Sequence, residues 1–276
     1  MIPAVIRCPR MILENGVRAK AAQPQSFRRP AVIGSTELQI SLLILLAVAQ
    51  ENLNELTPGE RADGWTLLFD GASTKGWLEV TGKPFPAKSW RVEDGCLRAV
   101  DPGGGFQDLR TERELSGSYE FQFDWKIAAG SNSGVKYLVQ RVDDWTNAAG
   151  RQARARGFEY QLFDDAVEPD HDPRKISGSL YEAIAPAKAA VRPVGEFNHS
   201  LLRVREGQVE HWLNGVKVVG FALDSAEAQL ALTRAMGKKP KQDPPPGNFI
   251  SLQNHGTPVW FRGLKLRELT SEKGAP

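Results

Sequence analysis

The sequence predicts an all-β protein, a single antiparallel jelly-roll β-sandwich that follows a signal segment. Apolar and polar side chains alternate with a period of two along several segments, most regularly at residues 118–127. Two-residue turn signals separate strand-like segments at Asp94-Gly95, Glu206-Gly207 and Asn214-Gly215. Only residues 226–236 have a helical composition. Without alternation of strands and helices, a sandwich is favoured over a parallel sheet.

The expected strands follow one another from Trp65 onward. The first hairpin pairs residues 90–93 with residues 96–100 across the Asp94-Gly95 turn. In residues 118–127, aromatic side chains that include Trp125 share one face and charged or amide side chains share the other, which predicts a half-buried strand. Further strands are expected at residues 134–141, 157–164, 179–184, 197–205, 248–253 and 259–269.

The N-terminus resembles an export signal. Residues 40–49 (ISLLILLAVA) form an apolar run of ten, which is shorter than a membrane span and ends in Ala47-Val48-Ala49, an A-x-A cleavage pattern. A membrane tether or a disordered segment is the alternative, and a start codon assigned too early would explain the long upstream region. We expect a signal peptide at 1–49, a linker at 50–62, a sandwich at 63–270 and a tail at 271–276, in a secreted or periplasmic bacterial protein.

Charge and cysteine content narrow the class of protein. Residues 1–49 carry a net charge of +4, which leaves 29 basic and 31 acidic side chains in the rest of the chain. Such a body has no electrostatic reason to bind nucleic acid, and no membrane contact is expected beyond the signal peptide. If cleavage follows Ala49, Cys96 is the one remaining cysteine, and its place on an alternating strand predicts a small buried apolar residue.

The segment 157–165 (GFEYQLFDD) is the strongest functional signal. Its alternation places Glu159 and Gln161 together on one strand face, where a carboxylate and a carboxamide are suited to binding a polyol. Other candidates for a sugar site each have a structural alternative as well: a turn cap for Asn132, core packing for Tyr181 and a satisfied strand-end imidazole for His255. Trp145 lies in a loop-like stretch and could stack on a sugar ring.

An ordered set of motifs resembles a known family. The set comprises WTLLFDG (65–71), WRVEDG (90–95), NSGVKY (132–137), GFEYQLFDD (157–165), GSLY (178–181), HWLNG (211–215), LQNHG (252–256) and VWFRGLKL (259–266). It resembles the 3-keto-disaccharide hydrolase domain family over residues 63–269. The resemblance implies a concanavalin A-like jelly roll and an exported carbohydrate-active enzyme. The chain departs from the family pattern at Asn254, where an Asp is usual, and at Glu168-Pro169-Asp170, where His-Pro-Asp is usual.

The resemblance implies hydrolysis of 3-keto-glycosides. An ordinary glycosidase uses two carboxyl groups, but the position that follows Glu159 on its strand face is Gln161. A ketone at C3 removes that need, because it acidifies the C2 proton and permits elimination followed by hydration. We expect Glu159 and His255 to be catalytic; the substrate-binding candidates are Asn132, Lys136, Gln161, Asp164, Tyr181, Gln253 and Trp145.

The sequence leaves open whether the protein binds a metal ion and whether it is an enzyme. Glu159, Asp164 and His255 could hold a divalent metal ion that acts as an electrophile, and the sequence assures no cofactor. The substrate is expected to be a small oligosaccharide or glycoside. The alternatives to an enzyme are a non-catalytic, lectin-like sandwich, which needs the polar face but not the acid and base, and a structural cell-surface module.

Overall fold

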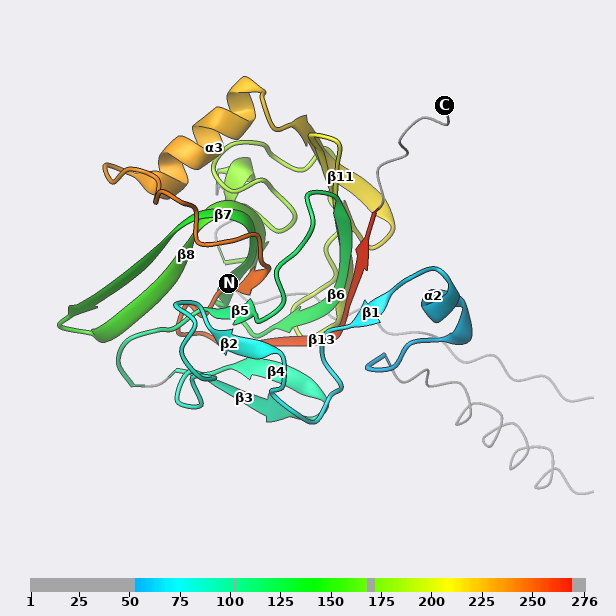
Figure 1. Cartoon of the computed structure of the whole chain (residues 1–276), viewed down its shortest axis with the longest axis horizontal. Helices are drawn as coiled ribbons and strands as arrows, with labels where there is room; N and C mark the ends of the chain where they lie inside the picture. Colours follow the sequence, from blue (N-terminus) through cyan, green and yellow to red (C-terminus); the bar gives the residue numbers. More distant parts are fainter. Residues whose placement is uncertain (1–52, 102, 168–171, 270–276) are drawn as a thin grey trace, which may run out of the picture. The chain divides into compact units, whose positions relative to one another are not determined.

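The computed structural model describes residues 53–101, 103–167 and 172–269, which lie in one compact unit, residues 52–276. The expected signal peptide lies outside the described residues. Within them the chain forms two antiparallel sheets (Figure 1). The strands of the eight-stranded sheet are β1 (Thr66–Leu67), β3 (Trp90–Glu93), β4 (Cys96–Ala99), β6 (Tyr119–Ile127), β9 (Asn198–Arg205), β10 (Gln208–Leu213), β11 (Val216–Ala222) and β13 (Val259–Glu268).

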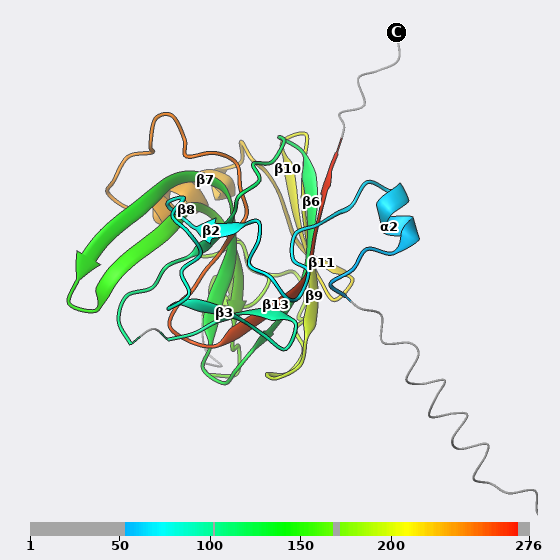
Figure 2. The same cartoon turned by 60° about the horizontal axis from the view of Figure 1, so that its bottom comes forward.

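The five-stranded sheet carries the polar motifs. Its order is β2 (Trp77–Glu79), β5 (Leu109–Thr111), β12 (Ser251–Leu252), β7 (Asn132–Asn147) and β8 (Gly150–Phe163). Strands β7 and β8 form a long curved ribbon that extends past the rest of its sheet (Figures 1 and 2). Helix α3 (Ala226–Met236) contacts β8, and the remaining helices are short: α2 (Pro58–Ala62) and a 3-10 turn, η1 (Pro173–Lys175).

The three turn dipeptides form tight hairpins as predicted. The first residues, Asp94, Glu206 and Asn214, have φ angles of 50°, 49° and 48°, and the glycines that follow them also have positive φ. Positive φ at both central residues is what a type I′ turn requires, and it matches the twist of the flanking strands. The turns therefore set the register of the β3–β4, β9–β10 and β10–β11 pairs.

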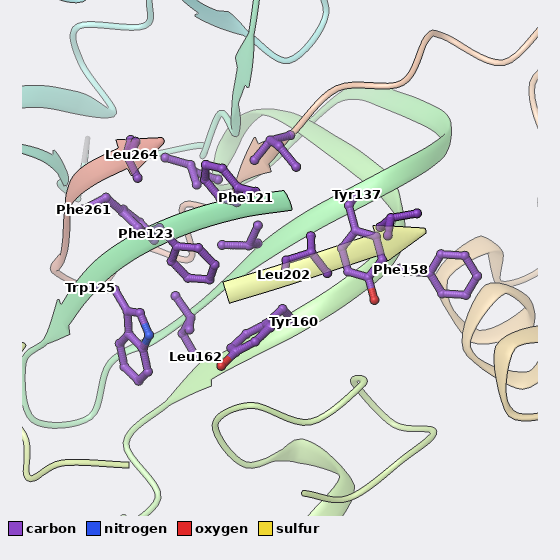
Figure 3. Packing of buried hydrophobic residues seen from close by; sticks show 14 of the residues in the cluster. Phe121, Phe123, Trp125, Tyr137, Phe158, Tyr160, Leu162, Leu202, Phe261 and Leu264 are labelled. Carbon is purple, nitrogen blue, oxygen red and sulfur yellow. The ribbon is translucent and has the colours of Figure 1, made fainter. Parts of the chain in front are cut away.

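The two sheets bury an aromatic core between them (Figure 3). From β6, Phe121, Phe123 and Trp125 are fully buried, as their alternation predicts. Phe123 meets Tyr160 of β8 edge-on, with ring centroids 5.5 Å apart. Because the side chains of β8 alternate, burying Tyr160 in this core directs Glu159 and Gln161 to the opposite face of the sheet. Cys96 is a buried free thiol, as expected.

Three predictions about elements need correction. Residues 179–184 do not form a strand: Leu180 makes isolated bridges to Tyr160 and Ile184, and the chain turns at Glu182 with φ 59°. In the stretch 248–253, only Ser251–Leu252 is strand. The expected linker is partly folded, because Asn54 bonds to Gly95 and Gly263, and Thr57 caps α2.

The prediction of an all-β antiparallel sandwich is confirmed. No helix of the described residues is long and apolar enough to cross a membrane.

Candidate active site

The polar face of the five-stranded sheet brings most of the predicted residues together. Lys136 on β7 lies directly opposite Glu159 on β8, and Gly134 lies opposite Gln161. Ser251 of β12 pairs with Lys136 on the other side of β7. Residues at such cross-strand positions have neighbouring side chains on one face, so the sheet itself assembles the site.

Gly134 makes room for the Glu159 carboxylate. A side chain at position 134 would overlap Oε1 of Glu159 and would lie 2.9 Å from its Cγ. The backbone of Gly134 is not left-handed, so glycine is needed here for space rather than for conformation. The glycine of the Asn-Ser-Gly motif therefore makes room for Glu159, which lies diagonally across the ribbon.

Burial raises the pKa of Glu159, with Asp108 adding to the rise and Lys136 opposing it. A carboxyl group desolvated in this way exchanges a proton closer to neutral pH than an exposed one. Its surroundings thus suit a general acid or base.

Asp108 is the electrostatic centre of the site. Its side chain is fully buried just before β5, and it forms ion pairs with Lys136 (3.5 Å) and Arg154 (2.9 Å). It also accepts the backbone N–H groups of Ala155 and Asn254. These contacts satisfy its charge, so Asp108 positions the cations rather than acting as a second free carboxylate.

His255 lies at the exposed edge of this cluster. Desolvation by the surrounding chain and the positive charge of Arg154 lower its pKa, so the imidazole is neutral at neutral pH. Glu159 and His255 both interact electrostatically with Lys136, Asp108 and Arg154, which places the two predicted catalytic groups at one cluster.

Asn254 fixes the turn that presents His255. Its Nδ2 donates to the carbonyl oxygens of Ser89 (2.7 Å) and Val100 (3.0 Å), while its Oδ1 accepts from Gly256 N–H (2.8 Å). A carboxylate could not make the two donations, so an amide suits this position in this chain.

The amide side chains on the face are buried and only partly bonded. Gln161 donates to Asn132 Oδ1 at 3.2 Å. Oε1 of Gln161, Oε1 of Gln253 and Oγ of Ser251 have no hydrogen-bond partner among the described residues. Buried polar atoms normally have partners, so their grouping on one face marks a place where a polyhydroxylated ligand or water would complete the bonding.

A small hollow of about 100 Å³ opens beside Glu159. Tyr181 lines it and donates its backbone N–H to the Glu159 carbonyl at 3.1 Å. Burial raises the pKa of the Tyr181 phenol, so it is a neutral hydrogen-bond donor. Glu182 also lines the hollow, but it pairs with Lys175 at 2.9 Å.

Two predicted residues lie away from this cluster. The carboxylate of Asp164 accepts backbone N–H groups from Gly130 and Ala166, which gives it a role in the turn after β8. Trp145 is not in a loop but near the end of β7, half-buried, where it lines a second hollow. Among the described residues no three His, Cys, Asp or Glu side chains come together as a metal site, so Glu159, Asp164 and His255 do not form the ligand set that the sequence left possible.

Sequence reasoning missed Asp108, Arg154, Arg156 and Arg234. An alternation of Ala and Arg at residues 153–156 was the available signal, since it predicts a strand with arginines on one face. The two alanines are indeed fully buried. No local pattern marked Asp108, whose partners come from β7 and β8.

The fold and site define a class: an antiparallel sandwich with a polar, charged face suited to saccharides. A family described as 3-keto-alpha-glucoside-1,2-lyase-like domains matches residues 64–267. The chain belongs to this family, as its motifs predicted. A 3-keto-disaccharide hydrolase from Bacteroides thetaiotaomicron is 30% identical over 237 residues, which cover 75% of this chain and 79% of the relative.

Solved structures agree with the family. A crystal structure of a candidate glycosyl hydrolase from Parabacteroides distasonis is 29% identical with a TM-score of 0.63, covering 79% of this chain and 99% of that one. A second such protein from the same organism is 24% identical with a TM-score of 0.51, covers 70% and 99% of the two chains, and shows the fold alone. The comparisons support the prediction of a carbohydrate-acting hydrolase.

Proposed function

We propose that the protein is an exported hydrolase that cleaves 3-keto-glycosides by elimination and hydration. The observation that carries the proposal is the environment of Glu159: a desolvated carboxyl group whose neighbouring carboxylates, Asp108 and Glu182, are both taken up in ion pairs. Direct displacement at C1 needs a second available carboxyl group, whereas elimination needs one base and one acid. The match to a 1,2-lyase-like family supports the same chemistry.

In the first step a base removes the C2 proton, which the C3 ketone has acidified. The electron pair forms a C1–C2 double bond, the C1–O bond breaks, and the leaving oxygen takes a proton. Water then adds its hydroxyl to C1 and a proton to C2, giving the free 3-keto sugar. Glu159 and His255 supply the proton transfers, and Lys136 lies beside Glu159 as a cationic donor for the enolate oxygen.

The other predicted residues position the sugar. Asn132, Gln161 and Gln253 supply amide groups along the polar face, and Tyr181 supplies a neutral hydroxyl beside Glu159. Burial raises the pKa of Glu159, which brings its proton exchange closer to neutral pH, whereas desolvation and Arg154 lower the pKa of His255, which leaves its imidazole free to accept a proton.

The test uses purified residues 50–276 and a 3-keto-disaccharide, with release of monosaccharide measured with and without chelator. Glu159→Gln and His255→Ala should each lower kcat about 100-fold or more. Glu227→Gln, an exposed carboxylate on α3 that does not line the hollow, is the matched control and should keep full activity. Full activity of Glu159→Gln would refute its role.

A lectin-like module remains the rival function. It predicts that the wild-type protein binds the 3-keto-disaccharide in calorimetry and never releases monosaccharide. Export is tested separately by expressing the full chain in a bacterium and sequencing the N-terminus of the secreted or periplasmic product, which should begin at Gln50. An uncleaved chain in the cytoplasmic fraction would contradict export.

A further inference from the structure

The hollow beside Glu159 has a second hollow next to it. Arg156, Arg234 and Ala235 line both. The second hollow, of about 480 Å³, lies between the β7–β8 ribbon and the end of α3 with residues 237–239. Because these lining residues are shared, the two hollows are neighbours, and together they are called the groove beside Glu159 below.

The second hollow is strongly cationic. Among its described lining residues are five basic side chains and one carboxylate: Arg141, Arg156, Arg234, Lys238 and Lys239 against Asp143. Arg141 is structural, because its guanidinium bonds to Asp143 and to three carbonyl oxygens of residues 236–240. These bonds hold the chain after α3 against β7.

Much of the remaining positive charge is available to a ligand. Arg156 uses Nε to bond Asp143 at 2.9 Å, and its two Nη groups have no acceptor among the described residues. Lys238 is exposed and likewise has no ion-pair partner in the part of the chain that the structure describes. Lys239 reaches Asp143 only at 3.9 Å with its side chain 66% exposed.

Trp145 adds an apolar surface to this cationic end. Its ring lines the same hollow, and the Arg156 guanidinium carbon lies 5.9 Å from the ring centroid. An indole ring with a guanidinium over it combines an apolar surface with positive charge, which suits a flat group that carries negative charge.

The two parts of the site thus differ in character. The face around Gln161 and Gln253 offers amide groups, whereas the second hollow of the groove offers Trp145 and five cationic side chains against one carboxylate. We propose that the sugar ring occupies the amide face and that the groove receives the leaving group, an anionic aglycone with an aromatic body. The inference rests on the proposed function, since it specifies the aglycone of that reaction.

The test compares two substrates of nearly equal shape, the 4-carboxyphenyl and 4-carbamoylphenyl 3-keto-α-glucosides, which differ in one negative charge. The readout is the ratio of their kcat/KM values. Intrinsic differences between the leaving groups cancel when this ratio is compared between variants. Arg156→Gln should lower the ratio about two- to fivefold and Lys238→Gln about twofold, as expected for partly exposed charge pairs.

Lys88→Gln, an exposed lysine that lines neither hollow, is the matched control and should leave the ratio unchanged. Raising the salt concentration from about 0.05 to about 0.5 M should reduce the wild-type preference for the carboxylate. A purely structural role of Arg156 through Asp143 would lower both rates equally and leave the ratio unmoved. An unchanged ratio in both Arg156→Gln and Lys238→Gln would overturn the inference.

A binding measurement separates this inference from the proposed function. If the wild-type protein hydrolyses neither these two substrates nor a 3-keto-disaccharide, the proposed function fails. Calorimetry with the unoxidised 4-carboxyphenyl and 4-carbamoylphenyl glucosides then tests the groove alone. Tighter binding of the carboxylate that is lost in Arg156→Gln supports the groove, and equal affinities overturn it.

Discussion

Replacing Gly134 with Ala should remove activity while leaving the fold intact. The added methyl would overlap Glu159 Oε1 and lie 3.0 Å from its Cδ, whereas ordinary contacts begin at 3.4 Å. The carboxylate must therefore retreat by about 1 Å, and a displacement of that size at a reacting group costs about 100-fold in rate. That factor corresponds to about 2.7 kcal/mol of lost transition-state stabilisation.

Stability should change little in the same variant. Alanine is favoured over glycine inside a strand by roughly 0.5–1 kcal/mol, which offsets part of the cost of moving one side chain. Gly117→Ala is the control, because position 117 has open space around it and no positive φ. We would measure kcat/KM on a 3-keto-disaccharide together with urea unfolding. Activity of Gly134→Ala within threefold of wild type would refute the positioning of Glu159.

Three further predictions concern buried polar groups. Burial lowers the pKa of His211 from 6.5 to about 4, so between these pH values the unfolded chain binds a proton that the folded chain does not. The free energy of unfolding should therefore fall by about 3 kcal/mol as the pH drops from 6.5 to 4. Urea titrations at several pH values should show that a His211→Gln variant lacks this part of the loss. Asp108→Asn leaves Lys136 and Arg154 without their buried counter-charge and should lower the free energy of unfolding by about 3 kcal/mol, and a change below about 1 kcal/mol would contradict the ion-pair assignment. In Asn254→Asp, a carboxylate oxygen would face the carbonyl oxygens of Ser89 and Val100 in place of the donating amide, which should lower Tm by about 4–8 °C in calorimetry. An unchanged Tm would count against the assigned orientation of the amide.

Much of the fold could be predicted because the hairpin turns and the strand alternation depend on residues that are neighbours in the sequence. The β-hairpin dipeptides and the alternation of β6 involve neighbours in sequence, and both were found as expected. Residues 179–184 show the limit of such rules. Leu180 satisfied the strand pattern, yet its burial comes from single bridges to Tyr160 and Ile184 rather than from a ladder. Alternation reports which side chains are buried, not what the backbone pairs with.

The site was half predictable for a related physical reason. Glu159 and Gln161 were found because they share one strand and one phase. Earlier in β8, at Gly157, the alternation between buried and outward-facing side chains shifts by one residue. The bulged part of β7 approaches Gly157 so closely that a side chain there would lie 2.7 Å from the Tyr137 carbonyl oxygen. Before that point the even-numbered Arg154 and Arg156 occupy the outer face, and after it the odd-numbered Glu159 does. If one alternation is assumed along the whole strand, the two arginines and Glu159 are assigned to opposite faces. The bulge instead brings their guanidinium and carboxylate groups to the same face.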